Sequence, residues 1–243
     1  MMRILPRPVE RALRRSYYRQ KAVEPEILHL ADWCPAGGVA IDVGGNRGDY
    51  SLFLAQLASK VYCFEPNPSL SVELKRLLTG LPVEVQNIGL GDEEGEFDLN
   101  IPYVDGLELH GWAGLNRNFI GQTWKGREVT EVRTVTVPVK RLDDLGITGV
   151  SFIKIDVEGH EFAVLKGAEE LIRRDGPNLL IEIEERHHSE PIQQIFDWLD
   201  DQGYAGSFLD GGVMRDISEF DSRIHQKDPD TSSYRNNFLF RKK

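Results

Sequence analysis

The chain of 243 residues has only two cysteines and lacks any long apolar segment. Cys34 and Cys63 cannot form a metal-ligand set by themselves, and the apolar strand pattern around Cys63 favours a buried free thiol. No apolar run approaches the roughly 20 residues that a membrane-spanning helix needs. Residues 1–21 also lack the apolar stretch of a secretory signal, so we expect a cytoplasmic protein.

Positive charge is scarce and unevenly distributed, since the net charge is −10. Residues 1–21 hold six arginines and one lysine against a single acidic residue, Glu10, so the rest of the chain is strongly acidic. An acidic body argues against a nucleic-acid partner. The basic segment predicts either a solvated helix that packs on the domain through Leu13 and Tyr17, or weak contact with an anionic membrane surface. The composition leaves the oligomeric state open.

Strand and helix patterns alternate along the rest of the chain, and no internal repeat interrupts them. This alternation predicts an α/β fold with a doubly wound, Rossmann-like, mostly parallel sheet of seven strands. We expect the last strand to be antiparallel because it follows a polar loop. Residues 1–36 form a basic helical extension in this scheme, and residues 37–243 form one domain. The predicted strands are Val39–Val43, Val61–Phe64, Val83–Leu90, Val150–Val157, Leu179–Ile183, Gly206–Leu209 and Asn237–Phe240, and the predicted helices are Ser51–Ser59, Ser69–Leu78 (with Ser69 as its N-cap), His160–Arg174 and Ile192–Gln202.

A long loop, Pro102–Gly126, separates two strands of alternating character at Phe97–Ile101 and Val132–Val139. It is longer than most connections in a compact domain, which indicates a function or mobility. Its aromatic residues predict either a surface that stacks on a sugar or a small local core, and the sequence favours neither. These residues are Tyr103, His110, Trp112, Phe119 and Trp124.

The strongest functional signal is the glycine-rich turn in Ile41–Tyr50. Glycines after a parallel strand let the chain turn sharply and approach a ligand closely, and the next helix begins with free N–H groups. Glu65 follows Gly44 by 21 residues, at the end of the next strand, where a carboxylate can accept hydrogen bonds from ribose hydroxyls. The glycine turn and Glu65 together predict an adenosine-bearing ligand. Backbone groups at Ile88 and Gly89 are expected to lie beside its base.

A dinucleotide is a poorer match to this turn. The dinucleotide pattern requires glycines at the positions that Asn46 and Asp49 occupy. A pyrophosphate would also lie close to the Asp49 carboxylate. The cationic methionine part of S-adenosylmethionine, by contrast, tolerates Asp42 and Asp49 nearby.

A second cluster of charged residues follows two later strands. Lys154, Asp156 and Glu158 recur at period two, and Glu182 and Glu184 repeat the pattern on the next strand. His187 and His188 come soon after. The cluster predicts substrate binding, base catalysis or a metal site, and the alternative is a structural ion-pair network, for example Lys154 with Glu182.

Several of these motifs together resemble the FkbM family of S-adenosylmethionine-dependent methyltransferases. The resemblance rests on Ile41–Tyr50, Phe64–Asn67, Leu142–Leu145 and above all Ile153–Gly159. It implies the seven-stranded methyltransferase sheet and O-methylation of a hydroxyl on a sugar, glycolipid or polysaccharide precursor, or on a natural product. Two features depart from the family pattern: Gly45 stands at a frequent alanine, and Trp112–Asn116 stands where a serine-bearing segment is expected.

The expected enzyme is therefore an S-adenosylmethionine-dependent O-methyltransferase with a small-molecule or glycan acceptor. The alternatives are a non-catalytic protein that binds an adenosyl ligand and a nicotinamide-dependent oxidoreductase. A divalent metal stays undecided, with Asp156, Glu182 and His187 as candidate ligands. The predicted catalytic residues are Asp156, Glu158, His160 and His187. The predicted cofactor-binding residues are Asp42, Gly44, Gly45, Asn46, Gly48, Tyr50, Glu65, Pro66, Asn67, Ile88, Gly89 and Asp156.

Overall fold

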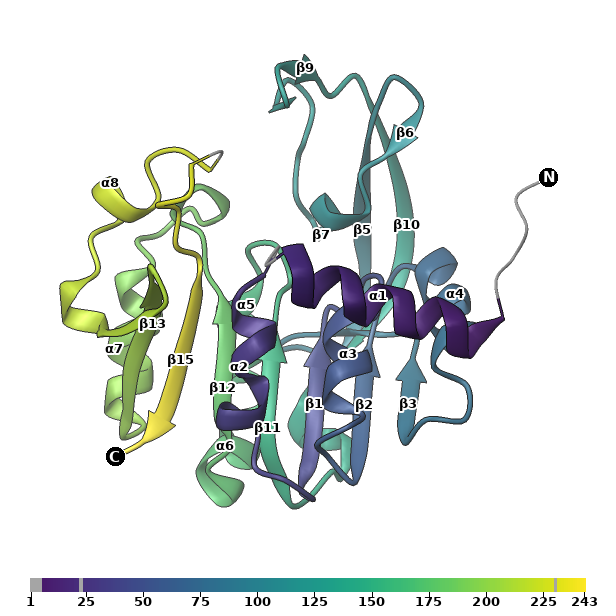
Figure 1. The fold of residues 1–243 in the computed structure, drawn as a ribbon. Coiled ribbons are helices and arrows are strands. Elements are labelled where there is room, and N and C mark those ends of the chain that lie inside the picture. Colours follow the sequence, from purple (N-terminus) through teal and green to yellow (C-terminus); the bar gives the residue numbers. More distant parts are fainter. Residues whose placement is uncertain (1–5, 22–23, 230) are drawn as a thin grey trace.

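The computed structural model describes residues 6–21, 24–229 and 231–243, and a large mixed sheet runs through its centre (Figure 1). The strand order is β14-β13-β15-β12-β11-β1-β2-β3. The strands of this sheet are β1 (Val39–Val43), β2 (Lys60–Phe64), β3 (Val83–Gln86), β11 (Val150–Ile155), β12 (Asn178–Glu182), β13 (Tyr204–Asp210), β14 (Val213–Asp216) and β15 (Asn237–Lys242).

Strands β1, β2, β3, β11 and β12 are parallel, and the order of the strands reverses at β1. The last strand, β15, runs antiparallel to both β12 and β13. The sheet has eight strands among the described residues, one more than the seven expected. The additional strand, β14, pairs with β13 across the tight turn at Gly211 and Gly212, which both have positive φ.

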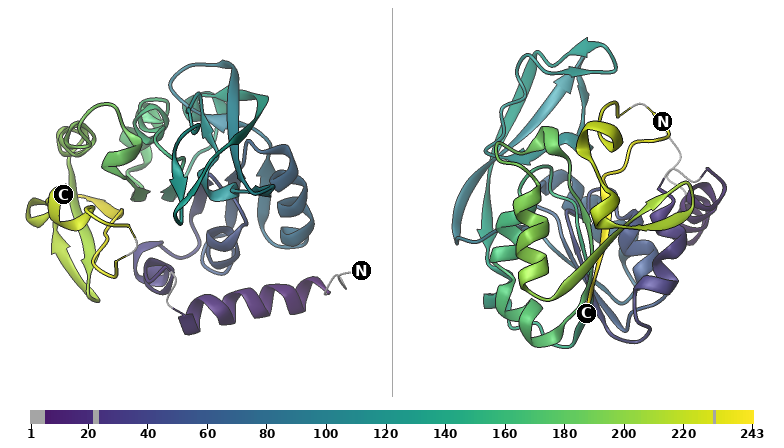
Figure 2. Two further views of the ribbon diagram at one scale, coloured as in Figure 1. Left: turned by 90° about the horizontal axis from the view of Figure 1, so that it is seen from above. Right: turned by 90° about the vertical axis from the view of Figure 1, so that its left-hand side faces the viewer.

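Helices cover both faces of the sheet (Figure 2). Apolar side chains of α2, α3 and α4 pack on the face that Ala40, Val61 and Cys63 present, and those of α5, α6 and α7 pack on the face of Ile41 and Ile153. This alternation along β1 and β2 follows from the period of two in a strand. The helices are α1 (Arg7–Lys21), α2 (Glu26–Trp33), α3 (Asp49–Leu54), α4 (Pro68–Leu78), α5 (Glu161–Lys166), α6 (Glu169–Asp175), α7 (Gln193–Asp201) and α8 (Ser222–His225).

Several element boundaries differ from the sequence expectation. The helix expected at Ser51–Ser59 is α3, which ends at Leu54. The helix expected at His160–Arg174 is two helices, which are separated at Gly167 and Ala168. Gly167 packs close to Gly91, since an added Cβ would lie 1.9 Å from the carbonyl oxygen of Gly91. The strand expected at Val83–Leu90 ends at Gln86, and β4 (Gly89–Leu90) joins a second sheet. Asn67, not Ser69, caps α4, since its Oδ1 accepts from the Ser69 N–H at 3.0 Å.

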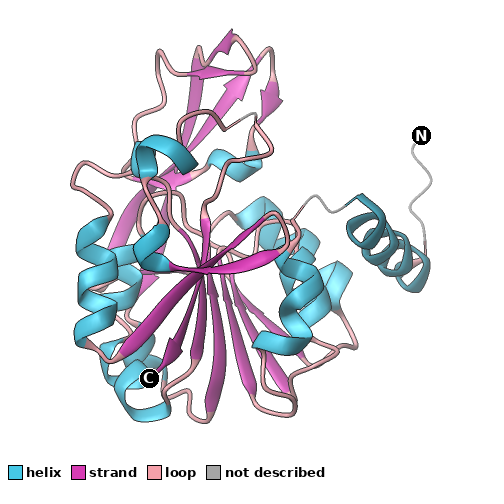
Figure 3. Cartoon of the chain, turned by 60° about the vertical axis from the view of Figure 1, so that its left-hand side comes forward, coloured by secondary structure: helices cyan, strands magenta, loops and turns pink. Residues whose placement is uncertain are grey.

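A hairpin of β5 (Gly95–Val104) and β10 (Glu131–Lys140) rises above the carboxyl edge of the main sheet (Figures 1 and 3). The long loop between them is mostly ordered into short elements, and Phe119 is completely buried in a small core with Val104, Leu109 and Val129. Phe119 thus belongs to a local core, with Trp112 and Trp124 packed against it, whereas Tyr103 packs against a second cluster and His110 lines a cavity. The short elements are β6 (Leu107–Glu108), the 3₁₀ helix His110–Trp112, β7 (Gly114–Leu115), β8 (Thr123–Trp124) and β9 (Arg127–Glu128).

Helix α1 lies against α3 (Figure 2), and two of its arginines bond to the body. Arg11 donates to the carbonyls of Leu77 and Thr79, and Arg14 donates to the carbonyl of Arg47. The expectation that Leu13 and Tyr17 pack on the domain is wrong, because they are 56% and 53% exposed. Polar contacts, not apolar burial, hold this helix in place. No described helix combines the length and apolar character required to cross a bilayer.

The turn after β1 leads to a prediction about stability. Gly44 has φ +82°, and an added Cβ would lie 1.8 Å from the carbonyl oxygen of Asp156. We expect Gly44→Ala to lower the free energy of unfolding by roughly 3 kcal/mol or more, from backbone strain plus a clash that must separate β1 from β11. Urea unfolding followed by circular dichroism measures this change.

Gly37→Ala is the matched control. Gly37 also has positive φ, +79°, but nothing lies within 4 Å of its added Cβ, so only the strain of roughly 1 kcal/mol applies. Equal losses in the two variants would contradict the close packing of the turn against Asp156.

Candidate active site

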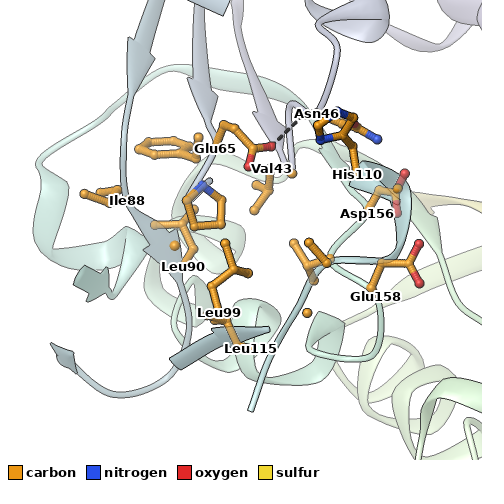
Figure 4. Close-up of a pocket in the computed structure, with 18 residues that line it drawn as sticks. Val43, Asn46, Glu65, Ile88, Leu90, Leu99, His110, Leu115, Asp156 and Glu158 are labelled. Carbon is orange, nitrogen blue, oxygen red and sulfur yellow. Dashed lines mark hydrogen bonds between the residues drawn. The ribbon is translucent and has the colours of Figure 1, made fainter. Parts of the chain in front are cut away.

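Two neighbouring cavities lie at the carboxyl ends of the parallel strands. The first cavity, of about 630 Å³, lies between the ends of β1 and β2, the chain after β3 and the hairpin (Figure 4). The second, of about 480 Å³, lies between the glycine turn, α1 and Lys154. Gly44, Asn46 and Asp156 line both cavities, so one elongated ligand can occupy the two together.

Each glycine of the turn is required by its surroundings. Gly44 and Gly45 line the second cavity, and an added Cβ on Gly45 would lie 2.3 Å from the sulfur of Cys63. Gly48 has φ +82° and packs against Leu74 of α4, where an added Cβ would lie 2.6 Å from a methyl carbon. The predicted cofactor role of Gly48 is therefore not supported, because this residue lines neither cavity and serves helix packing.

Glu65 has the most constrained carboxylate of the first cavity (Figure 4). Its Oε2 accepts from the Asn46 N–H at 2.7 Å, and its Oε1 accepts from the Asn67 N–H at 2.8 Å. Burial raises the pKa of Glu65 to about 7, against the lowering effect of these two N–H groups. The remaining lone pairs are thus held in place for hydroxyl donors in the cavity.

Some residues beside Glu65 line the first cavity, and others hold the surrounding elements in place. Pro66, Ile88 and Gly89 line the first cavity, as the sequence predicts, together with Leu99 and other apolar residues. Asn67 does not line it. Its side chain caps α4 and donates to Glu108 Oε1 at 3.3 Å, which ties the hairpin to the sheet. The apolar walls form a slot suited to a flat ring.

The second cavity is strongly polar. Asp42 and Tyr50 line it, in agreement with the sequence expectation. The Asp42 carboxylate accepts from the Ser51 hydroxyl, and burial raises the pKa of Asp42 to about 6. Tyr18 from α1 and Glu24 complete the wall. Carboxylates in this wall can receive an ammonium group.

Lys154 is the cation at the centre of this region and is 1% exposed. Its Nζ donates to Asn237 Oδ1 at 3.1 Å, lies 3.9 Å from Glu182 Oε2, and sits 5.0 Å from the centre of the Tyr50 ring. Burial alone would lower the pKa of Lys154, but Asp156, Glu182 and other carboxylates outweigh it and raise the pKa. The ion pair of Lys154 with Glu182 is therefore present, as the structural alternative expected.

A histidine–carboxylate pair stands where the first cavity meets a neighbouring one: Glu158 lines both, whereas His187 and Arg117 line only the neighbouring cavity. His187 Nδ1 lies 3.1 Å from Glu158 Oε2, and Arg117 of the hairpin donates to the same oxygen at 3.1 Å. Burial lowers the pKa of His187 to about 4, although Glu184 opposes the shift, so the ring is neutral at pH 7. A neutral imidazole that donates through Nδ1 has Nε2 as its proton acceptor, and this nitrogen lies 3.8 Å from Glu184 Oε2.

The side chains of Glu161 and His188 support the turn that carries Glu158. Glu158 has φ +56°, so the period of two does not continue past the end of β11 at Ile155. Glu161 Oε1 accepts from the N–H groups of Gly159 at 3.0 Å and Val157 at 3.3 Å. Its Oε2 lies 3.0 Å from His188 Nε2. Glu161 and His188 therefore fix the turn and do not face a substrate.

The structure gives no support to two sequence expectations about this cluster. His160 lines neither cavity, since its ring lies against Gly91, with Nε2 2.9 Å from where a Cβ of that residue would be. Of the candidate ligands for the undecided metal, Glu182 hydrogen-bonds with Asp156 and pairs with Lys154, whereas His187 pairs with Glu158. No three His, Cys, Asp or Glu side chains of the described residues are arranged to hold a metal ion.

Sequence reasoning missed several other residues of the site. Tyr18 and Glu24 come from the extension before the domain, and Arg117 comes from the hairpin. His110, one of the aromatic residues of the long loop, lines the first cavity. No spacing rule connects these segments to the glycine turn. Only the folded chain brings them to the cavities.

Comparisons with known proteins agree with this geometry. The family model for the methyltransferase FkbM domain matches residues 42–205. Methyltransferase sdnD of Sordaria araneosa is 28% identical over 233 residues, which cover 79% of this chain and 86% of that protein. Methyltransferase 1 of Beauveria bassiana is 29% identical over 172 residues, which cover 61% of this chain and 69% of that protein.

A solved structure shares the fold. The FkbM methyltransferase of Methylobacillus flagellatus KT superposes with a TM-score of 0.54 at 17% identity, and the match covers 84% of this chain. It covers 43% of that chain, so this protein spans less than half the length of that structure. The family match extends from Asp42, through both cavities and the Glu158 turn, to the start of β13. The chain therefore belongs to the FkbM family of S-adenosylmethionine-dependent methyltransferases.

Proposed function

We propose that this methyltransferase acts on a hydroxyl group of a sugar, a glycolipid or polysaccharide precursor, or a natural product. The observation that carries the proposal is the pair of neutral His187 and Glu158, 3.1 Å apart, of which Glu158 lines both the first cavity and the neighbouring cavity of His187. A hydroxyl is a weak acid, so its methylation needs a group that accepts its proton. An acceptor that is already nucleophilic would not need this pair.

The residues of the two cavities fit the donor in one orientation. Glu65 accepts hydrogen bonds from the ribose hydroxyls, and the apolar slot at Ile88 and Leu99 takes the base. The carboxylates of Glu24 and Asp42 face the methionine ammonium. Asp156, which lines both cavities, lies between these two ends, where a carboxylate stabilises a neighbouring cation.

In the reaction, the protein itself positions the acceptor and removes the proton of its hydroxyl group. When bound, S-adenosylmethionine supplies a methyl group activated by its positive sulfur. His187 Nε2 would accept the proton of the acceptor hydroxyl whose oxygen receives the methyl group. Glu158 holds the ring through Nδ1 and stabilises the imidazolium that results.

A nicotinamide-dependent oxidoreductase fits the site less well. Asp49 stands at the first turn of α3, where a pyrophosphate would need to bind, and Arg14 and Tyr18 already engage its carboxylate. A non-catalytic adenosyl-binding protein would have no use for the His187–Glu158 pair. Binding without turnover on any hydroxylated acceptor would support that alternative.

The first prediction concerns Glu65 and binding of S-adenosylhomocysteine. The ionised carboxylate accepts the ribose hydrogen bonds, and its pKa is about 7, so affinity should fall about tenfold between pH 8 and pH 6 as the group takes up a proton. Glu65→Gln should weaken binding 10- to 100-fold at pH 8 and remove this pH dependence. Isothermal titration calorimetry measures both effects.

Glu84→Gln is the control, because Glu84 pairs with Lys60 on the surface, away from both cavities. This variant should bind S-adenosylhomocysteine like the wild type at each pH. Failure of the wild type to bind it at all would refute the proposed donor site.

The second prediction concerns His187. We expect His187→Ala to lower kcat 100- to 10,000-fold, because the hydroxyl proton loses its acceptor, while binding of S-adenosylhomocysteine stays unchanged. Since the pKa of His187 is about 4, the wild-type kcat at saturating donor should stay constant from pH 8 to pH 5 and fall below that. The measurement is transfer of label from S-adenosylmethionine to a hydroxylated metabolite fraction.

His29→Ala serves as the matched histidine control. His29 lies on α2 and stacks on Trp33, outside the two cavities. It should keep the wild-type kcat. Wild-type turnover in His187→Ala would show that another group, or none, accepts the proton.

A further inference from the structure

Helix α1 has a row of apolar residues that faces away from the protein. Val9, Leu13 and Tyr17 recur at every fourth position and are 45%, 56% and 53% exposed. Residues four apart share one face of a helix, so these side chains form a single apolar stripe. In the view from above in Figure 2, α1 is the outermost element on its side of the described chain. The stripe therefore faces solvent.

The side of α1 that faces the protein is polar. Arg11, Arg14 and Tyr18 hold it to the body through hydrogen bonds to backbone carbonyls and to Asp49. A typical amphipathic surface helix has the reverse arrangement, with its apolar face against the core and its charges in water. Packing within the chain therefore does not account for the stripe. An exposed apolar face on a helix rich in arginine is typical of helices that lie in a membrane interface.

Positive charge accompanies the apolar stripe. Arg7, Arg15 and Arg19 form no ion pair with any carboxylate of the described residues. Glu10 is the one acidic residue of the helix, and it already pairs with Arg76 of α4. The outer side of α1 thus attracts a negatively charged partner.

An apolar groove of about 440 Å³ opens beside the end of α1, between α1, α2 and α3. Arg19 stands in its wall, 5.9 Å from the centre of the Phe53 ring. Most of the other wall residues are apolar, and one of them, Leu28 of α2, is 44% exposed. Contact with a hydrocarbon chain would remove these side chains from water, whereas contact with a nucleic acid would not. The groove and the stripe together favour a lipid surface among the negatively charged partners.

A second copy of this chain is a poorer partner for the same surface. Pairing of two α1 helices would bring the arginines of one copy against those of the other, and like charges repel. A bilayer with anionic headgroups offers negative charge and an apolar interior to the same face of the helix.

The acidic remainder of the chain determines how the protein can approach such a bilayer. Residues 1–21 hold six arginines and one lysine against one acidic residue, yet the whole chain has a net charge of −10. Contact through α1 keeps the acidic body about 10 Å, one helix diameter, from the lipid, and the Debye length at physiological salt is roughly 8 Å. Repulsion between the body and the lipid is therefore largely screened in this orientation.

We propose that α1 binds the protein to the surface of a membrane that contains anionic lipids. The apolar stripe enters the interface between headgroups and acyl chains, and Arg15 and Arg19 bind lipid phosphates. Tyr18 lines the second cavity from the opposite side of α1, so the bound protein holds its donor site one helix away from the lipid. This inference depends neither on the identity of the acceptor nor on the group that accepts its proton.

Sedimentation of the 243-residue chain with vesicles tests the proposal. Vesicles of phosphatidylcholine with about one phosphatidylserine in three lipids supply the anionic surface, and pure phosphatidylcholine is the neutral comparison. We expect the wild type to bind the anionic vesicles at least about tenfold more tightly than the neutral ones. This preference should disappear in about 1 M salt, which screens the attraction.

Two double variants separate the apolar from the charged contribution. Val9→Gln with Leu13→Gln removes the apolar side chains, keeps residues that favour a helix, and should weaken binding to anionic vesicles about tenfold or more. Arg15→Gln with Arg19→Gln should weaken it about 30-fold, because two charges that attract the lipid are lost.

Val213→Gln with Ile224→Gln is the matched control. These apolar residues of β14 and α8 are 58% and 66% exposed, and they lie among the C-terminal elements (Figure 1). The control should bind vesicles as the wild type does. Each variant should also bind S-adenosylhomocysteine like the wild type, which shows that it is folded and keeps the vesicle result separate from the donor site.

Three results would overturn the membrane contact. The first is equal or absent binding of the wild type to the two kinds of vesicle. The second is wild-type binding by the Val9→Gln, Leu13→Gln variant. The third is a dimer that requires Leu13 and forms without any vesicle binding, since a second copy would then cover the stripe. None of these results affects the proposed donor site or the role of His187.

Discussion

The buried ammonium of Lys154 is the interaction on which the rest of the site depends. It lies at the end of β11, contacts Asn237 of β15 and Glu182 of β12, and faces the ring of Tyr50 on α3. A cation without water is costly to bury, and removing one partner from such a buried group typically costs about 3–5 kcal/mol. Lys154 therefore lets a strongly acidic region exist inside the sheet. Without its charge, the carboxylates of Asp42, Asp156 and Glu182 would repel one another.

The turn after β11 joins the donor site to the base. Glu158 takes a left-handed conformation that a non-glycine residue adopts only when its surroundings hold it there. Those surroundings are Glu161, which accepts from the backbone of the turn, and Arg117, which binds both the carbonyl and the carboxylate of Glu158. Arg117 comes from the hairpin that also covers the first cavity. Closure of the cavity and placement of the Glu158–His187 pair thus depend on one contact.

The relation between the basic N-terminal helix and the acidic remainder of the chain becomes clear only in the folded structure. Two arginines of α1 face the body, because Arg11 and Arg14 bind carbonyls of the body and Arg14 also lies beside the Asp49 carboxylate. In return, α1 supplies Tyr18 to the second cavity. The basic segment and the acidic body are therefore partners within one chain. A membrane contact through this segment stays a prediction, and the exposed side chains of Leu13 and Tyr17 are the surface that it would use.

The sequence by itself determined the α/β alternation, the glycine turn, the spacing to Glu65 and the family, because each depends on local patterns of apolar residues, glycines and charges. It also indicated that Asp156, Glu158 and His187 would gather at strand ends, since parallel strands end at one edge. Only the tertiary structure placed His160 and Gly48 outside both cavities, because period and spacing do not show which neighbour a side chain meets. The same holds for Arg117, Tyr18 and Glu24, which come from segments outside the glycine turn and the strand ends. Their roles depend on contacts between distant parts of the chain, and such contacts are set by packing, not by any local rule.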